Sequence, residues 1–167
     1  MDTIDFQRTW NEYREGFGDP DLSMWVGLDK IHTLTNGDCI TELKVDLVSQ
    51  THHRTSGIYS SFRILDESNK YRMILSGHDS TTRPILADCI DQMFSTPDYD
   101  NDISGRYHCA HIMYAGWWYK ACGNSNLNGM MTELPDDSIG QKDQAFWSPL
   151  DGERSMLGID MQIRCID

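Results

Sequence analysis

The stretch Leu43-Lys-Val-Asp-Leu47 alternates apolar and charged residues, which is the pattern of a strand with one buried face and one face in water. The same alternation returns at Tyr71-Arg-Met-Ile-Leu75 and, near the end of the chain, at Ile159-Asp-Met-Gln-Ile163. A further strand is predicted around 59–64, and the polar residues 66–70 after it suit a hairpin connection. The sequence therefore predicts a central antiparallel sheet.

Two short helices are predicted before the first of these strands. The first carries aromatic residues at helical spacing, followed closely by glycines as a stop signal. These residues are Phe6, Trp10, Tyr13 and Phe17, with Gly16 and Gly18. The segment 20–23 offers a start signal for a second helix, whose apolar residues are Leu22, Trp25, Leu28 and Ile31. Short helices beside an antiparallel sheet predict the α+β fold class.

The middle of the chain has little regular pattern. From about residue 76 to residue 158 the sequence is rich in Gly, Asp, Asn and Ser, so we expect this region to consist mainly of loops. No internal repeat, low-complexity run or linker-like change of composition divides the 167 residues. We therefore expect a single domain, 1–167, with a loop-rich region at 76–158.

The charge balance excludes some classes of partner. The chain has 26 acidic and 14 basic residues, for a formal net charge of -12, and this charge repels both a nucleic-acid backbone and an anionic membrane surface. No run approaches the roughly 20 apolar residues of a membrane span, and the first ten residues are too polar for a signal-peptide core. Neither nucleic acid nor membrane is an expected partner.

Three carboxylates occupy alternate positions in the segment Asp98-Tyr-Asp-Asn-Asp102. In a turning loop such side chains can converge on one hard cation, for which calcium is the natural candidate. An EF-hand would need Gly and Glu where this chain has Ile103 and Cys109, so that type of site is excluded. Backbone carbonyls at 104–106 are the nearest additional ligands. The alternative is a solvated acidic turn.

The run Trp117-Trp-Tyr119 allows two interpretations, because exposed rings could stack on a sugar whereas buried rings would fill the core beneath the loops. His108, Cys109 and His111 resemble zinc ligands, but no fourth ligand stands at a useful spacing. The sequence has no activated serine or cysteine motif and no phosphate-binding glycine loop, so we expect no enzymatic activity.

A series of motifs covers nearly the whole chain, from about Asp5 to Arg164. They are Phe6-Gln-Arg-Thr-Trp-Asn-Glu-Tyr-Arg-Glu-Gly-Phe-Gly18, Trp25-Val-Gly-Leu-Asp-Lys-Ile-His-Thr-Leu-Thr35, Leu43-Lys-Val-Asp-Leu47, Phe94-Ser-Thr, Asp98-Tyr-Asp-Asn-Asp102, Cys109-Ala, Gly116-Trp-Trp-Tyr-Lys120, and Cys122 with Ser125-Asn-Leu-Asn-Gly129. In this order they resemble the fibrinogen C-terminal domain family, which includes ficolins, tachylectins, angiopoietins and the ends of fibrinogen chains. The resemblance implies a secreted module in which a central antiparallel sheet with short helices carries a loop-built calcium and ligand region.

The resemblance also implies the calcium ligands. In the family the second and third carboxylates of the acidic motif bind calcium, which assigns Asp100 and Asp102 as side-chain ligands. Ser104 and Arg106 are then the expected carbonyl ligands. The spacing from Asp102 to Cys109 is one residue longer than usual, which allows the carbonyl positions to shift by one.

The family pairs the cysteines that match Cys109 and Cys122, and the peptide before the second is often cis, here Ala121–Cys122. In lectin-like members this bond shapes a pocket for acetyl groups beside a His, where this chain has Gly123. The expected pocket residues are Trp117, Trp118, Ala121, Cys122, Gly123 and Trp147.

The function implied is calcium-dependent, lectin-like binding of glycans or acetylated groups in extracellular innate immune recognition. The alternative is a protein-binding or assembly module, such as a receptor ligand or a fibrinogen-like polymerisation domain. Relatives cluster to gain avidity, so the full-length protein is expected to be a homo-oligomer.

Two departures from the family pattern matter. The family's N-terminal subdomain should precede Asp5, so the chain is interpreted as a fragment or truncated product that lacks its leader. Five cysteines leave at least one without a partner in the chain, and Cys39, Cys89 and Cys165 have no clear family counterparts. Cys39 and Cys165 both flank predicted strands, so they form a bridge or, with Cys89, remain buried thiols.

Overall fold

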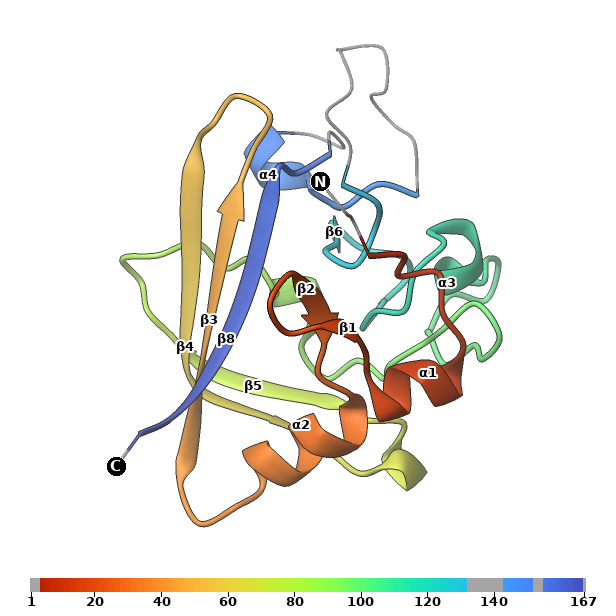
Figure 1. Ribbon diagram of the computed structural model, residues 1–167, viewed down its shortest axis with the longest axis horizontal. Coiled ribbons are helices and arrows are strands. Elements are labelled where there is room, and N and C mark those ends of the chain that lie inside the picture. The colour runs from red at the N-terminus through yellow and green to blue at the C-terminus, as the bar shows by residue number, and fades with distance from the viewer. Residues whose placement is uncertain (1–3, 132–142, 152–154, 167) are drawn as a thin grey trace.

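Figure 1 shows the computed structural model of the chain, which describes residues 4–131, 143–151 and 155–166. Its main sheet has four strands in these residues, in the order β5-β4-β3-β8, and every neighbouring pair is antiparallel. The strands are β3 (Ile40–Val48), β4 (Arg54–Ile64), β5 (Met73–His78) and β8 (Gly158–Ile166). The predicted antiparallel sheet is confirmed.

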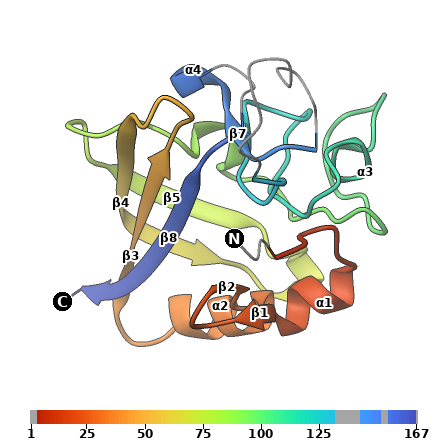
Figure 2. The ribbon, with the colours of Figure 1, turned by 45° about the horizontal axis from the view of Figure 1, so that its top comes forward.

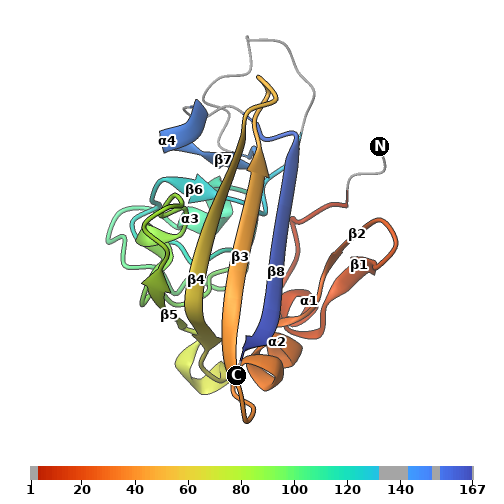
Figure 3. The same ribbon diagram turned by 90° about the vertical axis from the view of Figure 1, so that its left-hand side faces the viewer.

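Alternation along the strands decides which face of the sheet is buried. The register places Val45 of β3 between Gly57 of β4 and Met161 of β8, so the inward residues of the three strands form one apolar layer. The inward residues of β3 are fully buried, whereas those of β8 pack against the core but remain half-buried. The difference follows from the place of β8 at the edge of the sheet (Figure 3).

The N-terminal segment departs from the prediction. Helix α1 runs only from Trp10 to Glu15, because Thr9 and Glu12 form a reciprocal capping box at its start. The prediction of a second helix beginning at 20–23 is wrong, since a hairpin of β1 (Phe17–Asp19) and β2 (Ser23–Trp25) occupies that segment. Helix α2 spans Leu28–Thr35. Gly18, within β1, and Gly27, directly before α2, have φ of +95° and +108°, a backbone region that glycine enters without strain.

Only short elements connect β5 to β8 within the described residues. They are η2 (Ala87–Cys89), α3 (Cys109–Ile112), the paired strands β6 (Ser125–Asn126) and β7 (Phe146–Trp147), and α4 (Ser148–Asp151), while η1 (Glu67–Asn69) lies in the connection from β4 to β5. Figure 2 shows α3 and its neighbouring loops on the side of the molecule away from β4.

The core between the sheet and these loops is aromatic. Phe94 and Trp118 meet edge to face with ring centroids 4.9 Å apart, and the indole N–H of Trp118 donates to the carbonyl of Tyr71 at 2.8 Å. The hydroxyl of Tyr13 accepts a hydrogen bond from the N–H of Gly116 at 3.0 Å and donates to the carbonyl of Phe6 at 2.7 Å. The N-terminal helix is thereby fixed to the loop region.

All five cysteines lie in the described residues, and four of them form two disulfides. The bridge between Cys39 and Cys165 joins the start of β3 to the end of β8. The predicted bridge is thus confirmed, and the alternative of three buried free thiols is wrong. The second bridge joins Cys109 and Cys122, as the family resemblance implies. Cys89 is free and buried. Across the described part of the chain, no helix has the length and apolar character needed to cross a bilayer.

Candidate functional site

The first carboxylate of the acidic segment has a structural task. Asp98 accepts a hydrogen bond from the N–H of Trp10, in the first turn of α1, at 2.9 Å and another from the hydroxyl of Thr96 at 2.7 Å. Asp98 therefore anchors the loop to α1, whereas the Asp100 carboxylate accepts a hydrogen bond from the N–H of Asp102 at 3.2 Å.

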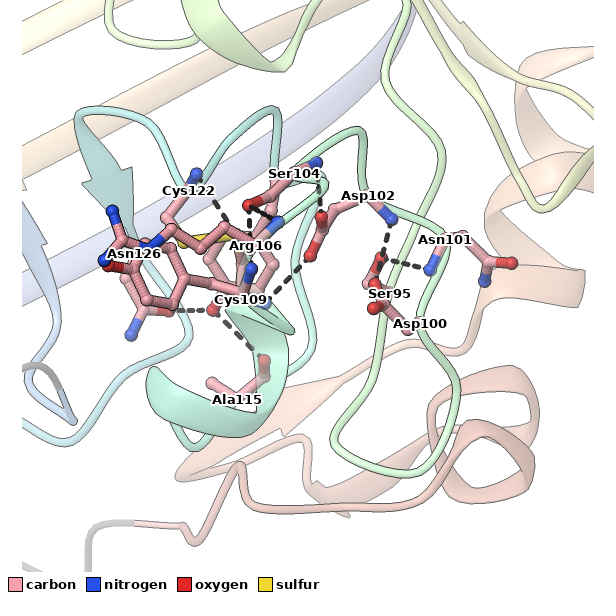
Figure 4. The surroundings of a disulfide bond; sticks show 12 residues. Ser95, Asp100, Asn101, Asp102, Ser104, Arg106, Cys109, Ala115, Cys122 and Asn126 are labelled. Atoms are coloured by element: carbon pink, nitrogen blue, oxygen red, sulfur yellow. Dashed lines mark hydrogen bonds between the residues drawn. A yellow bond between two sulfur atoms is a disulfide. The ribbon is translucent and has the colours of Figure 1, made fainter.

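Asp102 lies at the centre of the acidic loop (Figure 4). One of its carboxylate oxygens accepts from the N–H of Ser104 at 2.7 Å, and the other accepts from the N–H of Cys109 at 2.8 Å. Burial raises the pKa of the Asp102 carboxyl and the neighbouring Asp100 carboxylate raises it further, although the N–H groups of Cys109 and Ser104 lower it. Two carboxylates held this close repel each other, and a cation between them would relieve that repulsion.

The residues after Asp102 form a turn around the hydroxyl of Ser104, which accepts from the N–H groups of Arg106 and Tyr107 at 3.4 Å and 3.1 Å. None of the described residues donates a hydrogen bond to the carbonyl oxygen of Ser104 or Arg106. Carboxylate oxygens beside free carbonyls are the donor set that calcium prefers, so the residues present fit a calcium ion with water completing the coordination.

Zinc does not fit this region. His108 and His111 stack with ring centroids 5.8 Å apart, and Nε2 of His108 bonds the carbonyl of Thr96 at 3.0 Å. In the residues that the structure describes, no three His, Cys, Asp or Glu side chains come together as a metal-binding group. A site at Asp100 and Asp102 thus depends on carbonyl and water oxygens rather than on further side chains.

The Cys109–Cys122 disulfide holds the acidic loop against the following segment. The N–H of Cys109 binds Asp102, and the N–H of Ile103 donates to the carbonyl of Lys120 at 2.9 Å. The prediction of a cis peptide at Ala121–Cys122 is wrong, because no peptide bond between described residues is cis. Cys122 makes the turn with a positive φ of 29°.

The six predicted pocket residues do not share one environment. The rings of Trp117, Trp118 and Trp147 are 0%, 1% and 4% exposed, so they fill the core and present no open face to a sugar. Ala121 and Gly123 are exposed beside half-buried Cys122. Of the six, only Trp118 lines the cleft of about 370 Å³ between β8 and the β1–β2 hairpin. A ligand pocket at 121–123 stays a prediction.

Sequence reasoning missed a set of exposed apolar residues in the acidic loop and just after α3. They are Tyr99, Ile103, Tyr107 and Tyr114, with exposed fractions of 38%, 63%, 49% and 52%. Loop residues follow no period, so no pattern in the sequence distinguishes an exposed tyrosine here from a buried one. Tyrosine is enriched in protein interfaces, which makes these residues candidates for contact with a ligand.

Comparison with known proteins agrees with this architecture. The family described as "Fibrinogen beta and gamma chains, C-terminal globular domain" matches residues 2–166. Ryncolin-4 of Cerberus rynchops is 40% identical over 129 residues, which are 77% of this chain and 37% of ryncolin-4. Human angiopoietin-4 is 35% identical over 167 residues, which are 99% of this chain and 33% of that protein. The chain thus spans about a third of the length of these relatives.

Solved structures show the same fold. The fibrinogen-like globe domain of human ANGPTL2 superposes with a TM-score of 0.90 at 31% identity, covering 98% of this chain and 75% of that one. Lamprey fibrin D-dimer, complexed with the peptide ligand Gly-His-Arg-Pro-amide, gives 0.81 at 27% identity, covering 99% and 60%. The chain therefore belongs to the family of fibrinogen C-terminal globular domains, which are non-enzymatic binding modules.

Proposed function

We propose that the chain is an extracellular recognition domain whose binding loop is stiffened by calcium and whose ligand is a protein. The observation that carries this proposal is the division of labour in the acidic loop. Asp98 anchors α1, while Asp100 and Asp102 are joined by a hydrogen bond from the N–H of Asp102 and lie near the free carbonyls of Ser104 and Arg106. Calcium bound there would supply the positive charge that lets both carboxylates remain ionised.

Hydrogen bonds and a disulfide connect the proposed calcium site to the exposed loops around it. Asp102 organises the turn through the N–H groups of Ser104 and Cys109, and Cys109 is covalently joined to Cys122. A change at Asp102 therefore reaches both the exposed loop that follows it and the exposed turn at 121–123. Two disulfides support an extracellular location, because oxidising compartments preserve such bonds.

A protein ligand is favoured over a glycan by the kind of residue that the loop exposes. The side chains of Ile103, Tyr107 and Tyr114 are about half exposed or more. The guanidinium of Arg106 lies over the Tyr107 ring, 5.2 Å from its centroid. Tyrosine and arginine are enriched at protein interfaces. The tryptophans predicted to line a sugar pocket are buried, so they offer no ring to a glycan at the surface.

Cell binding by a tetramerised, labelled form of the domain tests this proposal. We expect binding that is lost in EGTA, lost after trypsin treatment of the cells, and unchanged by N-acetylglucosamine. Tyr107→Ala with Tyr114→Ala should weaken it, while Leu34→Ala, which removes an equally exposed side chain from α2, should not. Inhibition by the sugar would establish the lectin-like alternative, and binding that persists in EGTA would contradict the role of calcium.

A further inference from the structure

The sequence contains two Asn-Gly pairs, Asn36–Gly37 and Asn128–Gly129. Such a pair can rearrange without an enzyme, because the main-chain nitrogen of the glycine can attack the side-chain amide carbon of the asparagine. Glycine permits this approach, since it has no Cβ and few conformational restrictions. The two pairs share the same local chemistry, so the fold decides which of them reacts.

The pair Asn128–Gly129 is held in a position that blocks the attack. Asn128 is 5% exposed, and its side-chain amide donates to the carbonyl of Gly116 at 2.9 Å. The N–H of Gly129 donates to the carbonyl of Asn126 at 3.3 Å. The backbone of Gln144 lies so close to Gly129 that a Cβ there would collide with it. The attacking nitrogen is therefore engaged, and its surroundings leave no room for movement.

The pair Asn36–Gly37 is placed differently. Both residues are exposed, and they directly follow the end of α2 at Thr35. Among the described residues, none accepts a hydrogen bond from the N–H of Gly37. A Cβ on Gly37 would meet nothing within 4 Å apart from its chain neighbours. The attacking nitrogen is free here, and the backbone around it has space to reach the conformation that the reaction needs.

The side chain of Asn36 fastens the end of α2 to the end of β4. Its amide nitrogen donates to the carbonyl of His32, one turn back in α2, at 2.8 Å and to the carbonyl of Ile64, the last residue of β4, at 2.9 Å. The N–H of Ile64 donates in turn to the hydroxyl of Thr35 at 3.3 Å. Both acceptors of the Asn36 amide are carbonyl oxygens, so this position requires an NH₂ group.

We propose that Asn36–Gly37 is a site of spontaneous deamidation and that the product releases α2 from β4. The nitrogen of Gly37 bonds to Cγ of Asn36 as the Cγ–Nδ2 bond breaks, and ammonia leaves with the proton of the glycine nitrogen. Water then opens the five-membered imide to aspartate or isoaspartate. A carboxylate at residue 36 has no proton to donate to the two carbonyls, and the dipole of α2 disfavours negative charge at this end of the helix.

The site lies apart from the proposed binding loops. Figure 1 and Figure 2 show the end of α2 and the turn into β3 at one end of the main sheet, away from α3. Deamidation should therefore lower the stability of the domain and leave the acidic loop before α3 unchanged. The reaction does not depend on whether that loop binds calcium.

Peptide mapping by mass spectrometry compares the two pairs in one sample of folded protein, aged for several weeks at body temperature in mildly alkaline buffer. We expect aspartate and isoaspartate to accumulate at residue 36 but not at residue 128. In denaturant the two pairs should react at similar rates, which attributes the difference to the fold. Gly37→Ala should suppress the reaction because its methyl group hinders ring closure, while the open space around Gly37 lets the fold accept it.

Asn36→Asp reproduces the aspartate product and measures its effect on stability. We expect a Tm about 3–6 °C below that of the wild type, because two hydrogen bonds are lost. The control is Asn11→Asp, at an exposed position in the first turn of α1. It adds the same charge where the helix dipole favours it, and it should not lower the Tm.

Three results would overturn the proposal. The first is a conversion at Asn36 that is no faster than at Asn128 in the folded protein, and the second is a difference between the pairs that persists in denaturant. The third is a Tm of Asn36→Asp that equals the wild-type value or falls only as far as that of Asn11→Asp, which would assign any loss to added charge rather than to the contacts of Asn36.

Discussion

The carboxylate of Asp98 accepts a hydrogen bond from the N–H of Trp10 at 2.9 Å, although the two residues are 88 positions apart. The same carboxylate accepts from Thr96. One acidic residue of the loop thus belongs to the packing of α1, and the other two remain for a cation.

Replacement of Asp98 should therefore separate stability from metal binding. Asp98→Ala leaves the N–H of Trp10 and the hydroxyl of Thr96 without their acceptor, so we expect a loss of about 1–3 kcal/mol in the free energy of unfolding. Urea denaturation measures it. Asp21→Ala, at an exposed position in the β1–β2 turn, is the control and should cost less than about 0.5 kcal/mol. Equal effects would show that the Asp98 contact carries no stability.

Gly116 is packed too closely for a side chain. A Cβ at this position would lie 2.6 Å from the Tyr13 ring and 2.9 Å from the Phe94 ring, both in the buried core. Gly116→Ala should lower the free energy of unfolding by about 1–3 kcal/mol, because the rings must leave their packed positions. Gly37→Ala has open space around the added methyl and is the matched control. A neutral Gly116→Ala would mean that the aromatic core is looser than described.

The two disulfides should contribute unequally. The bridge between Cys39 and Cys165 closes a separation of 126 residues, against 13 for Cys109 and Cys122. On the chain-entropy treatment the long loop contributes about 5 kcal/mol and the short one about 3 kcal/mol. Paired serine variants of each bridge, compared by thermal unfolding, test the order. A larger loss from the short bridge would show that its role in holding the acidic loop outweighs the entropy of the unfolded chain.

The free thiol of Cys89 should be unreactive toward thiol reagents in the folded protein. Burial raises its pKa to about 12, so at pH 8 the thiolate is a fraction on the order of 10⁻⁴. We expect no reaction with a thiol reagent under native conditions and one labelled thiol per chain in denaturant with the disulfides intact. Rapid labelling of the native protein would contradict the buried position.

The sheet could be predicted because its signal is local. Alternation in 43–47, 71–75 and 159–163 marks which residues face the core, and the structure places these segments in one antiparallel sheet, the second of them from Met73 onward. The hairpin at 17–25 was missed because its aromatic residues fall at helical spacing, and glycines at 18 and 27 override that spacing through their backbone conformation. Side-chain periodicity carries no information about φ.

The candidate site can be predicted only in part from the sequence, because the roles of its residues depend on contacts with distant segments. The acidic motif names three carboxylates, but their separate roles depend on Trp10, which is distant in the sequence. The sequence allows a surface or a core role for Trp118, and its contacts with Phe94 and Tyr71, both distant in the sequence, place it in the core. The turn at Cys122 likewise depends on contacts that spacing does not encode.

The most direct test of the account is thermal unfolding with and without calcium for the wild type, Asp102→Asn and Asp98→Asn. At calcium about 100-fold above its Kd, the wild type should gain about 2.7 kcal/mol and melt about 5–10 °C higher. Asp102→Asn should abolish this shift. Asp98→Asn should lower the Tm in EGTA but leave the calcium-induced increase in Tm unchanged. A wild-type Tm that calcium does not change, or a shift that survives Asp102→Asn, would contradict a calcium site at Asp100 and Asp102.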